Sequence, residues 1–253
     1  MKHQGPVLLI NANNTNTSFA LANEKKILRV IRVPTIAIRG VPFEPGEYTS
    51  VVLASVVPAA TKKLLRGLPV RPLIVSASIE LGIGVDYPNK KQIGADRLAN
   101  AVGVARLYGA PAIVVDFGTA LTFDIVSSSS EYVGGVIAPG LASVTDYLYQ
   151  RTALLPRIKI AEPRSVIGKS TAAAMRVGAV VGYRGLVKEI LKALRRERGL
   201  RSAVVVATGG YARLIAEKIP EIRHVNPMLT LEGLRFIYLR NCAAHNRRRV
   251  RLS

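Results

Sequence analysis

The alternation of hydrophobic and polar positions predicts two similar strand–turn–strand units. The first covers residues 7–21 and opens with the apolar run 7–10, and the second covers residues 112–126 and opens with the apolar run 112–115. In both units small polar residues form the turn, and a second, partly alternating run follows. The units lie about one lobe apart, so this weak repeat favours a duplicated fold over a tandem array.

Further strands and helices are expected between and after these units. Apolar runs predict strands over residues 51–57, 73–76, 132–138 and 203–207. Helices are predicted over residues 95–107 and 171–198, and from about Tyr211 and Thr230 onwards. Because strands and helices are mixed along the chain, the predicted fold class is α/β.

Two of the predicted helices carry local signals. Thr230 is a good N-cap for the last helix, and one face of that helix comprises Leu231, Leu234, Tyr238 and Asn241. The helix over 171–198 contains Gly178, Gly182 and Gly185. Each glycine costs about 1 kcal/mol relative to alanine, so we expect close backbone packing or a kink there.

Length and composition indicate a protein with two lobes. At 253 residues the chain suits an N-terminal lobe over 1–110 and a C-terminal lobe over 111–253, and 49% hydrophobic residues can fill two cores. No apolar run reaches the ~18 residues of a membrane span. The N-terminus runs directly into a strand, which leaves no room for a signal peptide, and the lone Cys242 excludes an intrachain disulfide. We therefore expect a cytoplasmic protein.

The strongly basic charge could attract polymers of phosphate. The chain has 36 Lys and Arg against 16 Asp and Glu, a formal net charge of +20. The basic residues are spread along the chain, however, and the one dense cluster, residues 247–251, has no aromatic residue for base stacking. We expect a solvated basic tail and consider a nucleic-acid partner unlikely, with sequence-specific DNA reading as the less favoured alternative.

The turn Asp116-Phe117-Gly118-Thr119 has the residues of a phosphate-binding loop. Glycine lets the backbone approach a phosphate, a threonine hydroxyl and main-chain N–H groups donate to its oxygens, and an acid can hold a cation. The same four residues also make ordinary hairpin turns. A partial echo at residues 11–15, and a Gly-Gly turn at 209–210 after a strand, favour the functional interpretation.

Residues 94–97, Gly-Ala-Asp-Arg, open the predicted helix over 95–107. In one interpretation Asp96 only complements the helix dipole and Arg97 pairs with it. In the other, Asp96 is a general base beside an arginine that binds an anionic substrate, since guanidinium groups bind carboxylates in a bidentate way.

Together these motifs resemble the type III pantothenate kinase family, and the resemblance runs from Leu8 to Asn241. Any one motif is modest, but the ordered set is strong. The matching segments are residues 14–17, Tyr87 with Asn89, 94–100, 116–120 with Thr122 and Asp124, 134–135, 138–141, 167–171, Gly178 with 182–183, 207–210 and 229–234.

The resemblance implies a fold and an activity. The fold would be two actin-like, ribonuclease H-like lobes related by internal duplication, with a nucleotide cleft between them. The activity would be transfer of the γ-phosphoryl group of ATP to pantothenate, the first step of coenzyme A synthesis. Family members form homodimers, with the pantothenate pocket near the interface.

The resemblance also implies roles for particular residues. Asp96 would be the catalytic base, and the pantothenate site would comprise Tyr87, Gly94, Ala95, Asp96, Arg97 and Thr171. ATP would be bound by Asn11, Ala12, Asn13, Asn14, Thr15, Asn16, Thr17 and Ser18 of the first hairpin, and by Thr119, Gly209 and Gly210. Asp116 would hold K⁺ or NH₄⁺, and Mg²⁺ would bridge the phosphates. Positioning and charge neutralisation are most of what phosphoryl transfer requires.

The first hairpin departs from the family pattern Asp-x-Gly-Asn-Thr. Asn13 replaces the glycine, which is tolerable because asparagine reaches the left-handed backbone region readily. Asn11 replaces the aspartate, and a neutral amide is a weaker ligand for a Mg²⁺ shell that prefers carboxylates. Two hypotheses follow: an active pantothenate kinase, or a non-catalytic relative that binds nucleotide or pantothenate or acts in regulation. A smaller departure is Lys90, where the family tends to have proline.

Overall fold

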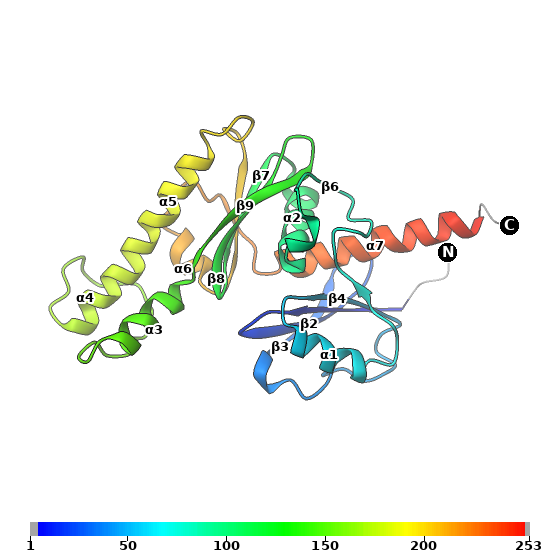
Figure 1. Ribbon diagram of the computed structural model, residues 1–253, viewed down its shortest axis with the longest axis horizontal. Coiled ribbons are helices and arrows are strands. Elements are labelled where there is room, and N and C mark those ends of the chain that lie inside the picture. The colour runs from blue at the N-terminus through cyan, green and yellow to red at the C-terminus, as the bar shows by residue number, and fades with distance from the viewer. Residues whose placement is uncertain (1–4, 251–253) are drawn as a thin grey trace. The chain divides into compact units, whose positions relative to one another are not determined.

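The chain divides into two compact units, which are described here one at a time (Figure 1). The computed structural model describes the backbone of residues 5–250 and the side chains of residues 5–242. The first unit comprises residues up to Leu107 together with those from Met228 onwards, and the second comprises Tyr108–Pro227. The prediction that the whole of 111–253 forms the second lobe is wrong, because the last helix packs on the first sheet.

The first unit is built on a five-stranded sheet in the order β3-β2-β1-β4-β5. Strands β1, β2 and β3 form an antiparallel meander, and β4 and β5 continue the sheet in parallel with β1. The bounds are β1 Val7–Ala12, β2 Asn16–Ala22, β3 Ile27–Pro34, β4 Ser50–Ser55 and β5 Leu73–Ile74.

The helices of the first unit are η1 Thr35–Ala37, α1 Pro58–Gly67, η2 Lys90–Gln92, α2 Ala95–Tyr108 and α7 Leu229–Val250. Helices α1 and α7 contact the sheet, and a short strand β6 spans Gly84–Val85. Apolar side chains such as Leu8, Ile10, Phe19, Leu53 and Leu64 form a buried core cluster. All five are fully or almost fully buried. For Leu8 and Ile10 this agrees with the continuous apolar run of β1, which is typical of a central strand.

The second unit repeats the strand arrangement of the first. In the order β9-β8-β7-β10-β11, the first three strands are antiparallel, and β10 and β11 run parallel to β7. The bounds are β7 Ala112–Phe117, β8 Ala120–Val126, β9 Glu131–Pro139, β10 Val204–Gly209 and β11 His224–Val225. Two sheets with the same order and the same strand directions support the predicted duplication.

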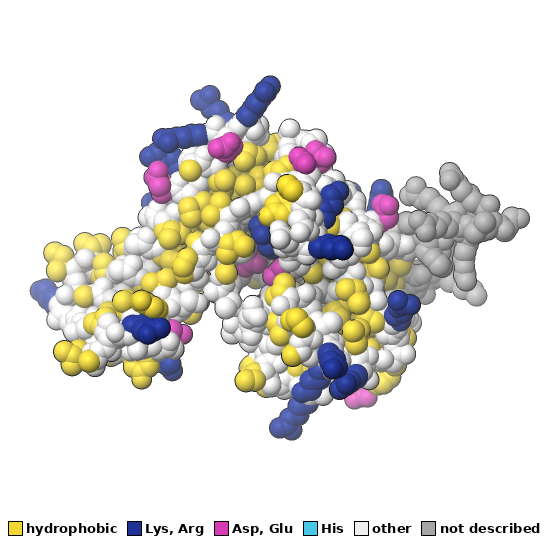
Figure 2. All heavy atoms as spheres, in the orientation of Figure 1, with side chains coloured by type: hydrophobic (Ala, Val, Ile, Leu, Met, Phe, Trp, Pro, Cys, Tyr) yellow, Lys and Arg dark blue, Asp and Glu magenta, His cyan; other side chains and the backbone are white. Residues whose placement is uncertain are grey.

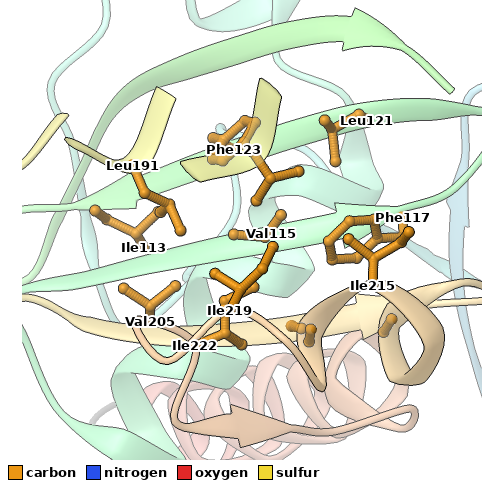
Figure 3. Close-up of a cluster of buried hydrophobic side chains, with 14 of the residues drawn as sticks. Ile113, Val115, Phe117, Leu121, Phe123, Leu191, Val205, Ile215, Ile219 and Ile222 are labelled. Atoms are coloured by element: carbon orange, nitrogen blue, oxygen red, sulfur yellow. The ribbon is translucent and has the colours of Figure 1, made fainter. Parts of the chain in front are cut away.

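Helices and a buried core complete the second unit. The helices are α3 Leu141–Arg151, α4 Thr171–Val177, α5 Tyr183–Leu194 and α6 Ala212–Ala216. Figure 3 shows the core, in which Ile113, Val115 and Phe117 of β7 meet Leu191 of α5 and Ile215 of α6. These residues bury apolar surface at roughly 25 cal/mol per Å².

The predicted helix over 171–198 is observed as α4 and α5 joined by one π-helical turn, Gly178–Gly182. The expectation of close backbone packing at the three glycines is wrong within the described chain. A Cβ atom added at Gly178, Gly182 or Gly185 would meet nothing within 4 Å. The irregularity in this segment is the π turn, a feature at which helices can kink.

Close packing occurs instead where α7 crosses α2. A Cβ atom at Gly233 would lie 1.9 Å from the carbonyl oxygen of Ala99, and one at Gly103 would lie 2.7 Å from that of Leu229. The predicted apolar face of α7 is confirmed, since Leu231 and Leu234 are buried. The basic cluster 247–251 lies outside the side chains that the structure describes.

Among the described residues, no helix is both long and apolar enough to cross a membrane.

The two kinds of glycine predict opposite effects of one substitution. Gly185→Ala should stabilise the protein, because it improves helix propensity by about 1 kcal/mol without a steric clash, which raises Tm by roughly 2–4 °C. Gly233→Ala should destabilise it by about 1–3 kcal/mol, because the new methyl group overlaps Ala99. Thermal unfolding of both variants by circular dichroism measures this. A lower Tm for Gly185→Ala would mean that something outside the described chain packs on α5.

Candidate functional site

The first hairpin ends in an exposed turn with two unsatisfied amide oxygens. Asn14, Thr15 and Asn16 are exposed at the tip between β1 and β2. Asn11 is only 7% exposed, and its side-chain Oδ1, like that of Asn13, is buried without a hydrogen-bond partner. A buried acceptor without a donor costs about 1–3 kcal/mol, so such an atom indicates a missing ligand or solvent partner.

Thr35 fastens this turn, a role that the sequence did not reveal. Its hydroxyl donates to the carbonyl oxygen of Asn13 at 2.6 Å and lies 3.0 Å from the hydroxyl of Thr17. The hydroxyl of Ser18 accepts from Arg32 Nε at 3.3 Å. Thr17 and Ser18 are buried, so the hydrogen bonds of these two predicted ATP-binding residues stabilise the turn from inside the protein. No local sequence signal could have identified Thr35, because it reaches the turn only through the pairing of β3 with β2.

The start of α2 holds Asp96 and Arg97. The backbone N–H of Arg97 donates to Asp96 Oδ1 at 2.9 Å. Burial raises the pKa of the Asp96 carboxyl, and the hydrogen bond and positive charge of Arg97 offset this only in part. Gly94 makes room for the carboxylate, since a Cβ atom there would lie 2.6 Å from Asp96 Oδ1. A carboxylate with a raised pKa is better suited to accept a proton than an ordinary aspartate.

The first hairpin and the start of α2 are neighbours in the first unit. The carbonyl oxygen of Ala12, at the end of β1, accepts from the backbone N–H of Val56 at 3.1 Å. A side-chain carbon of Val56 lies 3.4 Å from the Cβ position of Gly94. Tyr87 is half-buried in the segment between β6 and η2, in the same unit. The structure thus brings Asn11–Ala12 and Gly94–Asp96 to one region.

The second hairpin meets the end of β10. The register of β7 and β10 pairs Asp116 with Thr208 and Phe117 with Gly209. Gly209 has φ +92°, and a Cβ atom there would lie 2.6 Å from Asp116 Oδ1. Only glycine adopts this conformation without strain and leaves space for the carboxylate. Asp116 and Gly209 are therefore adjacent at the ends of β7 and β10, and Thr119 is exposed at the tip of the second hairpin.

Gly140 supports the Gly118–Thr119 turn. A Cβ atom at Gly140 would lie 2.0 Å from the carbonyl oxygen of Thr119, so no larger residue fits. The hydroxyl of Tyr183 donates to the carbonyl oxygen of Pro139 at 2.9 Å, and burial raises the pKa of Tyr183 to about 12, which keeps that proton in place. Gly140 and Tyr183 belong to the segments that resemble the kinase family, but the sequence alone could not show that they support this turn.

Thr171 lies on the exposed first turn of α4 in the second unit. Its helix is capped by Ser170, whose hydroxyl accepts from the backbone N–H of Ala173 at 3.2 Å. The predicted pantothenate residues are therefore divided between the units, with Tyr87 and 94–97 in the first and Thr171 in the second.

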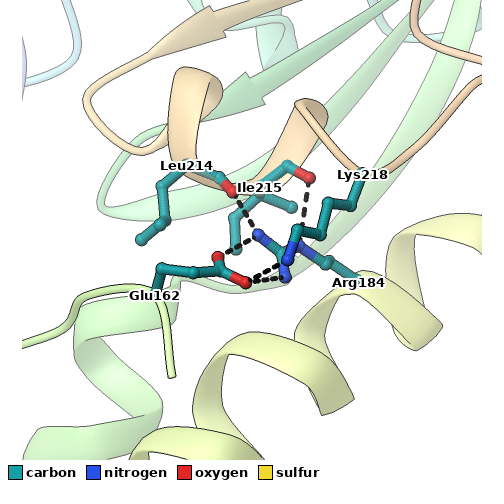
Figure 4. Close-up of polar contacts among 5 residues, drawn as sticks. All are labelled: Glu162, Arg184, Leu214, Ile215 and Lys218. Atoms are coloured by element: carbon teal, nitrogen blue, oxygen red, sulfur yellow. Dashed lines mark hydrogen bonds and ion pairs between the residues drawn. The ribbon is translucent and has the colours of Figure 1, made fainter. Parts of the chain in front are cut away.

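A charged network secures the segment that precedes α4 (Figure 4). Buried Arg184 of α5 donates to both carboxylate oxygens of Glu162, at 3.1 and 2.5 Å, and to the backbone carbonyl oxygens of Leu214 and Ile215. Lys218 adds a contact to Glu162 at 2.7 Å. Hydrogen bonds from Arg184 and then Lys218 hold the pKa of Glu162 at about 2. The network ties residue 162 to α6, the helix that follows the Gly209–Gly210 turn.

The side chains present fit a cation whose coordination shell is supplied mainly by water and by the phosphate groups of a bound nucleotide. Among the described residues, no group of three His, Cys, Asp or Glu side chains could hold a metal ion. The first hairpin, in the first unit, offers the amide oxygens of Asn11 and Asn13, and the second hairpin, in the second unit, carries the carboxylate of Asp116. Amide oxygens alone suit a Mg²⁺ ion that keeps water and phosphate oxygens in its shell.

The Glu162 network predicts a pH-dependent contribution to stability. The pKa of Glu162 falls from 4.5 to about 2 on folding, so the stabilisation is complete above about pH 4.5 and is lost as the pH falls towards 2. Glu162→Gln should lower Tm at pH 7, and the difference from wild type should shrink below pH 4.5. Glu189→Gln, in an exposed pair with Lys192, is the control and should change Tm little. An equal difference at pH 7 and pH 3 would contradict the prediction.

Comparisons with known proteins identify the family of this chain. Residues 7–193 match the family described as type III pantothenate kinase. The type III pantothenate kinase of Akkermansia muciniphila is 52% identical over 234 residues, covering 90% of this chain and 96% of that protein.

Solved structures are similar in fold. A conserved Baf family protein from Campylobacter jejuni has a TM-score of 0.59 at 19% identity, covering 93% of this chain and 99% of that one. Component A of the (R)-2-hydroxyglutaryl-CoA dehydratase of Acidaminococcus fermentans has a TM-score of 0.53 at 12% identity, covering 95% and 100%. The predicted fold class, two actin-like α/β lobes, is confirmed. The match over most of the sequence shows that the chain belongs to the type III pantothenate kinase family.

Proposed function

We propose that this chain is a kinase that transfers the γ-phosphoryl group of ATP to the hydroxyl group of pantothenate, the first step of coenzyme A synthesis. Membership of the family supports this activity. The observation that carries the mechanism is Asp96, a carboxylate with a raised pKa in the first turn of a helix, next to Arg97.

Asp96 acts as the general base. The pantothenate hydroxyl oxygen forms a bond to the γ-phosphorus while the bond from the γ-phosphorus to the bridging oxygen breaks, and ADP leaves. The hydroxyl proton passes to the Asp96 carboxylate. Gly94 contributes by leaving space beside that carboxylate.

Arg97 orients the substrate by binding the carboxylate of pantothenate, for which a guanidinium fork is well suited. The other residues proposed for pantothenate binding are Tyr87, Gly94 and Ala95 of the first unit and Thr171 of the second. The network of Glu162, Arg184 and Lys218 lies in the second unit, where it braces the segment ahead of α4. The predicted cleft between the lobes stays a prediction.

ATP is held by the two hairpins and the Gly-Gly turn. The exposed tip Asn14–Asn16 and Thr119 offer backbone N–H groups and hydroxyls to phosphate oxygens. Gly209 and Gly210 contact the adenosine. Thr17 and Ser18 support the first turn through their internal hydrogen bonds.

Two kinds of cation complete the site. Mg²⁺ neutralises charge on the transferring phosphates when it is bound. Asp116 holds K⁺ or NH₄⁺ beside Gly209, because an acid at a phosphate-binding turn needs a counter-charge when ATP arrives. Activity that is the same in sodium-only and potassium buffers at constant ionic strength would contradict this part.

A homodimer is part of the proposal. Apolar side chains are exposed on one unit along α3 and the π turn to α5, namely Val144, Tyr147, Val181 and Leu186. Figure 2 shows hydrophobic side chains gathered over this end of the second unit. Sedimentation equilibrium measures the mass, and a monomer would contradict the proposal. Location in the cytoplasm stays a prediction.

The alternative, a non-catalytic relative, rests on Asn11 alone. Asp96, Arg97, Asp116, Thr119 and Thr171 are all retained, as a working site requires. The buried oxygen of Asn11 also has no hydrogen-bond partner, which supports a position that still faces a ligand and is in line with weakened metal binding rather than loss of the site.

Asp96→Asn tests the general base. Loss of the base should lower turnover by about 10²- to 10⁴-fold in a coupled assay with pantothenate, ATP, Mg²⁺ and K⁺, and leave ATP affinity almost unchanged. Since burial disfavours the Asp96 charge, Tm at pH 7 should not fall. The wild-type rate should be lost as pH falls through a pKa above 3.8.

Asp146→Asn is the matched control and should keep normal turnover. Asp146 lies on α3 and forms an exposed ion pair with Arg157. Retention of more than about a tenth of wild-type turnover by Asp96→Asn would overturn the assignment of the base.

Asn11→Asp tests whether the first hairpin is short of one charge. The new carboxylate should raise Mg²⁺-dependent turnover by about 10- to 150-fold, equivalent to roughly 1.5–3 kcal/mol for a charge-assisted contact. Because the added carboxylate should tighten the binding of Mg²⁺-ATP, the variant should also gain more Tm from Mg²⁺-ATP than wild type does. An unchanged rate would mean that other groups already hold the metal, and inactivity of both forms would favour the non-catalytic alternative.

A further inference from the structure

A shallow hollow in the second unit is lined almost entirely by charged side chains. It encloses about 800 Å³ where α5 ends and the chain turns into β10. Figure 2 shows Lys and Arg side chains gathered over this tip. The lining residues are Lys192, Arg195, Arg196, Glu197, Arg198, Gly199, Arg201 and Glu221, five basic against two acidic.

The basic groups of the hollow have few partners among the residues that the structure describes. In the described part of the chain, the side chains of Arg196, Arg198 and Arg201 make no ion pair or hydrogen bond, and Lys192 has only a long contact of 3.5 Å to Glu189. Arg195 Nε is buried and has no acceptor. Gathering like charges raises the free energy of the folded state, and a buried donor without an acceptor adds to it. A bound anion would relieve both.

The helix dipole explains only part of this cluster. Basic residues complement the C-terminal end of a helix within its last turn, which accounts for Lys192 and Arg195 at the end of α5. Arg198 and Arg201 lie beyond that turn, on the connection to β10, yet face the same hollow.

The hollow is separate from the candidate active site. It lies at the end of the sheet where β7 and β10 begin, since the backbone N–H of Val204 donates to the carbonyl oxygen of Pro111. Asp116 and Gly209 stand at the other end of the same two strands. Six-residue strands at about 3.3 Å per residue separate the two by roughly 17–20 Å.

We propose that this hollow is a second anion site, which binds a small ligand that carries several phosphate groups. Guanidinium forks match phosphate oxygens, and Arg195, whose buried Nε has no acceptor, is one of the lining residues. Glu221 also has a buried carboxylate oxygen without a partner, which can accept from a hydroxyl of the ligand. Within the described part of the chain, no aromatic side chain lines the hollow, so these residues do not provide the stacking platforms of single-stranded nucleic-acid binders.

The test is isothermal titration of the full chain with tripolyphosphate, and in parallel with ATP. Wild type should bind tripolyphosphate, and the affinity should fall as salt is raised. The triple variant Arg196→Gln/Arg198→Gln/Arg201→Gln should lose about tenfold or more in affinity, because it removes three exposed phosphate partners. ATP should lose one of two binding events if nucleotides use the site, and none if only inorganic polyphosphate does.

A charge-matched control separates the hollow from general basicity. Lys62→Gln/Lys63→Gln/Arg66→Gln removes the same charge from exposed positions on α1, in the other unit. It should leave tripolyphosphate affinity within about twofold of wild type. Equal losses in both triple variants, binding of citrate as tight as that of tripolyphosphate, or no binding by wild type would each overturn the proposal.

Discussion

The pairing of a hairpin with a parallel strand, present in each sheet, is the constraint on which the rest of the structure depends. It brings the polar end of the first strand next to the end of the parallel strand, so Asp116 meets Gly209 and Asn11 lies in line with Ala54. In the second sheet, Asp116 and Gly209 lie at one end of β7 and β10, and the basic hollow lies near the other end of these strands. One arrangement of strands therefore positions both of the sites that we propose there.

Glycines then determine how closely the functional groups can approach the neighbouring backbone. Gly94 leaves space for the Asp96 carboxylate, Gly209 for that of Asp116, and Gly140 for the turn at Thr119. At each of these positions a methyl group would overlap a neighbouring atom. The exposed glycines of the 171–194 segment have no such neighbour, which shows that a glycine in a motif need not have a packing role in its own chain.

Buried polar groups divide into those that the protein satisfies and those that it leaves open. Arg184 is satisfied by Glu162 and by carbonyl oxygens of α6, and it stabilises the second unit. Asn11 Oδ1 and Arg195 Nε have no partner, and each lies at a place where we propose a ligand. Because an unsatisfied buried group is costly, these atoms are better guides to binding than the net charge of +20.

The sequence by itself determined the local features: the two hairpins, the helix that opens with Asp96 and Arg97, and the apolar face of the last helix. These follow from the periodicity of apolar residues and from the conformations that small polar residues allow. Only the tertiary structure decided that the last helix belongs to the first unit, that Thr35 fastens the first turn, and that basic residues near Arg195 share one hollow. Such features depend on contacts between distant segments, which local patterns do not encode.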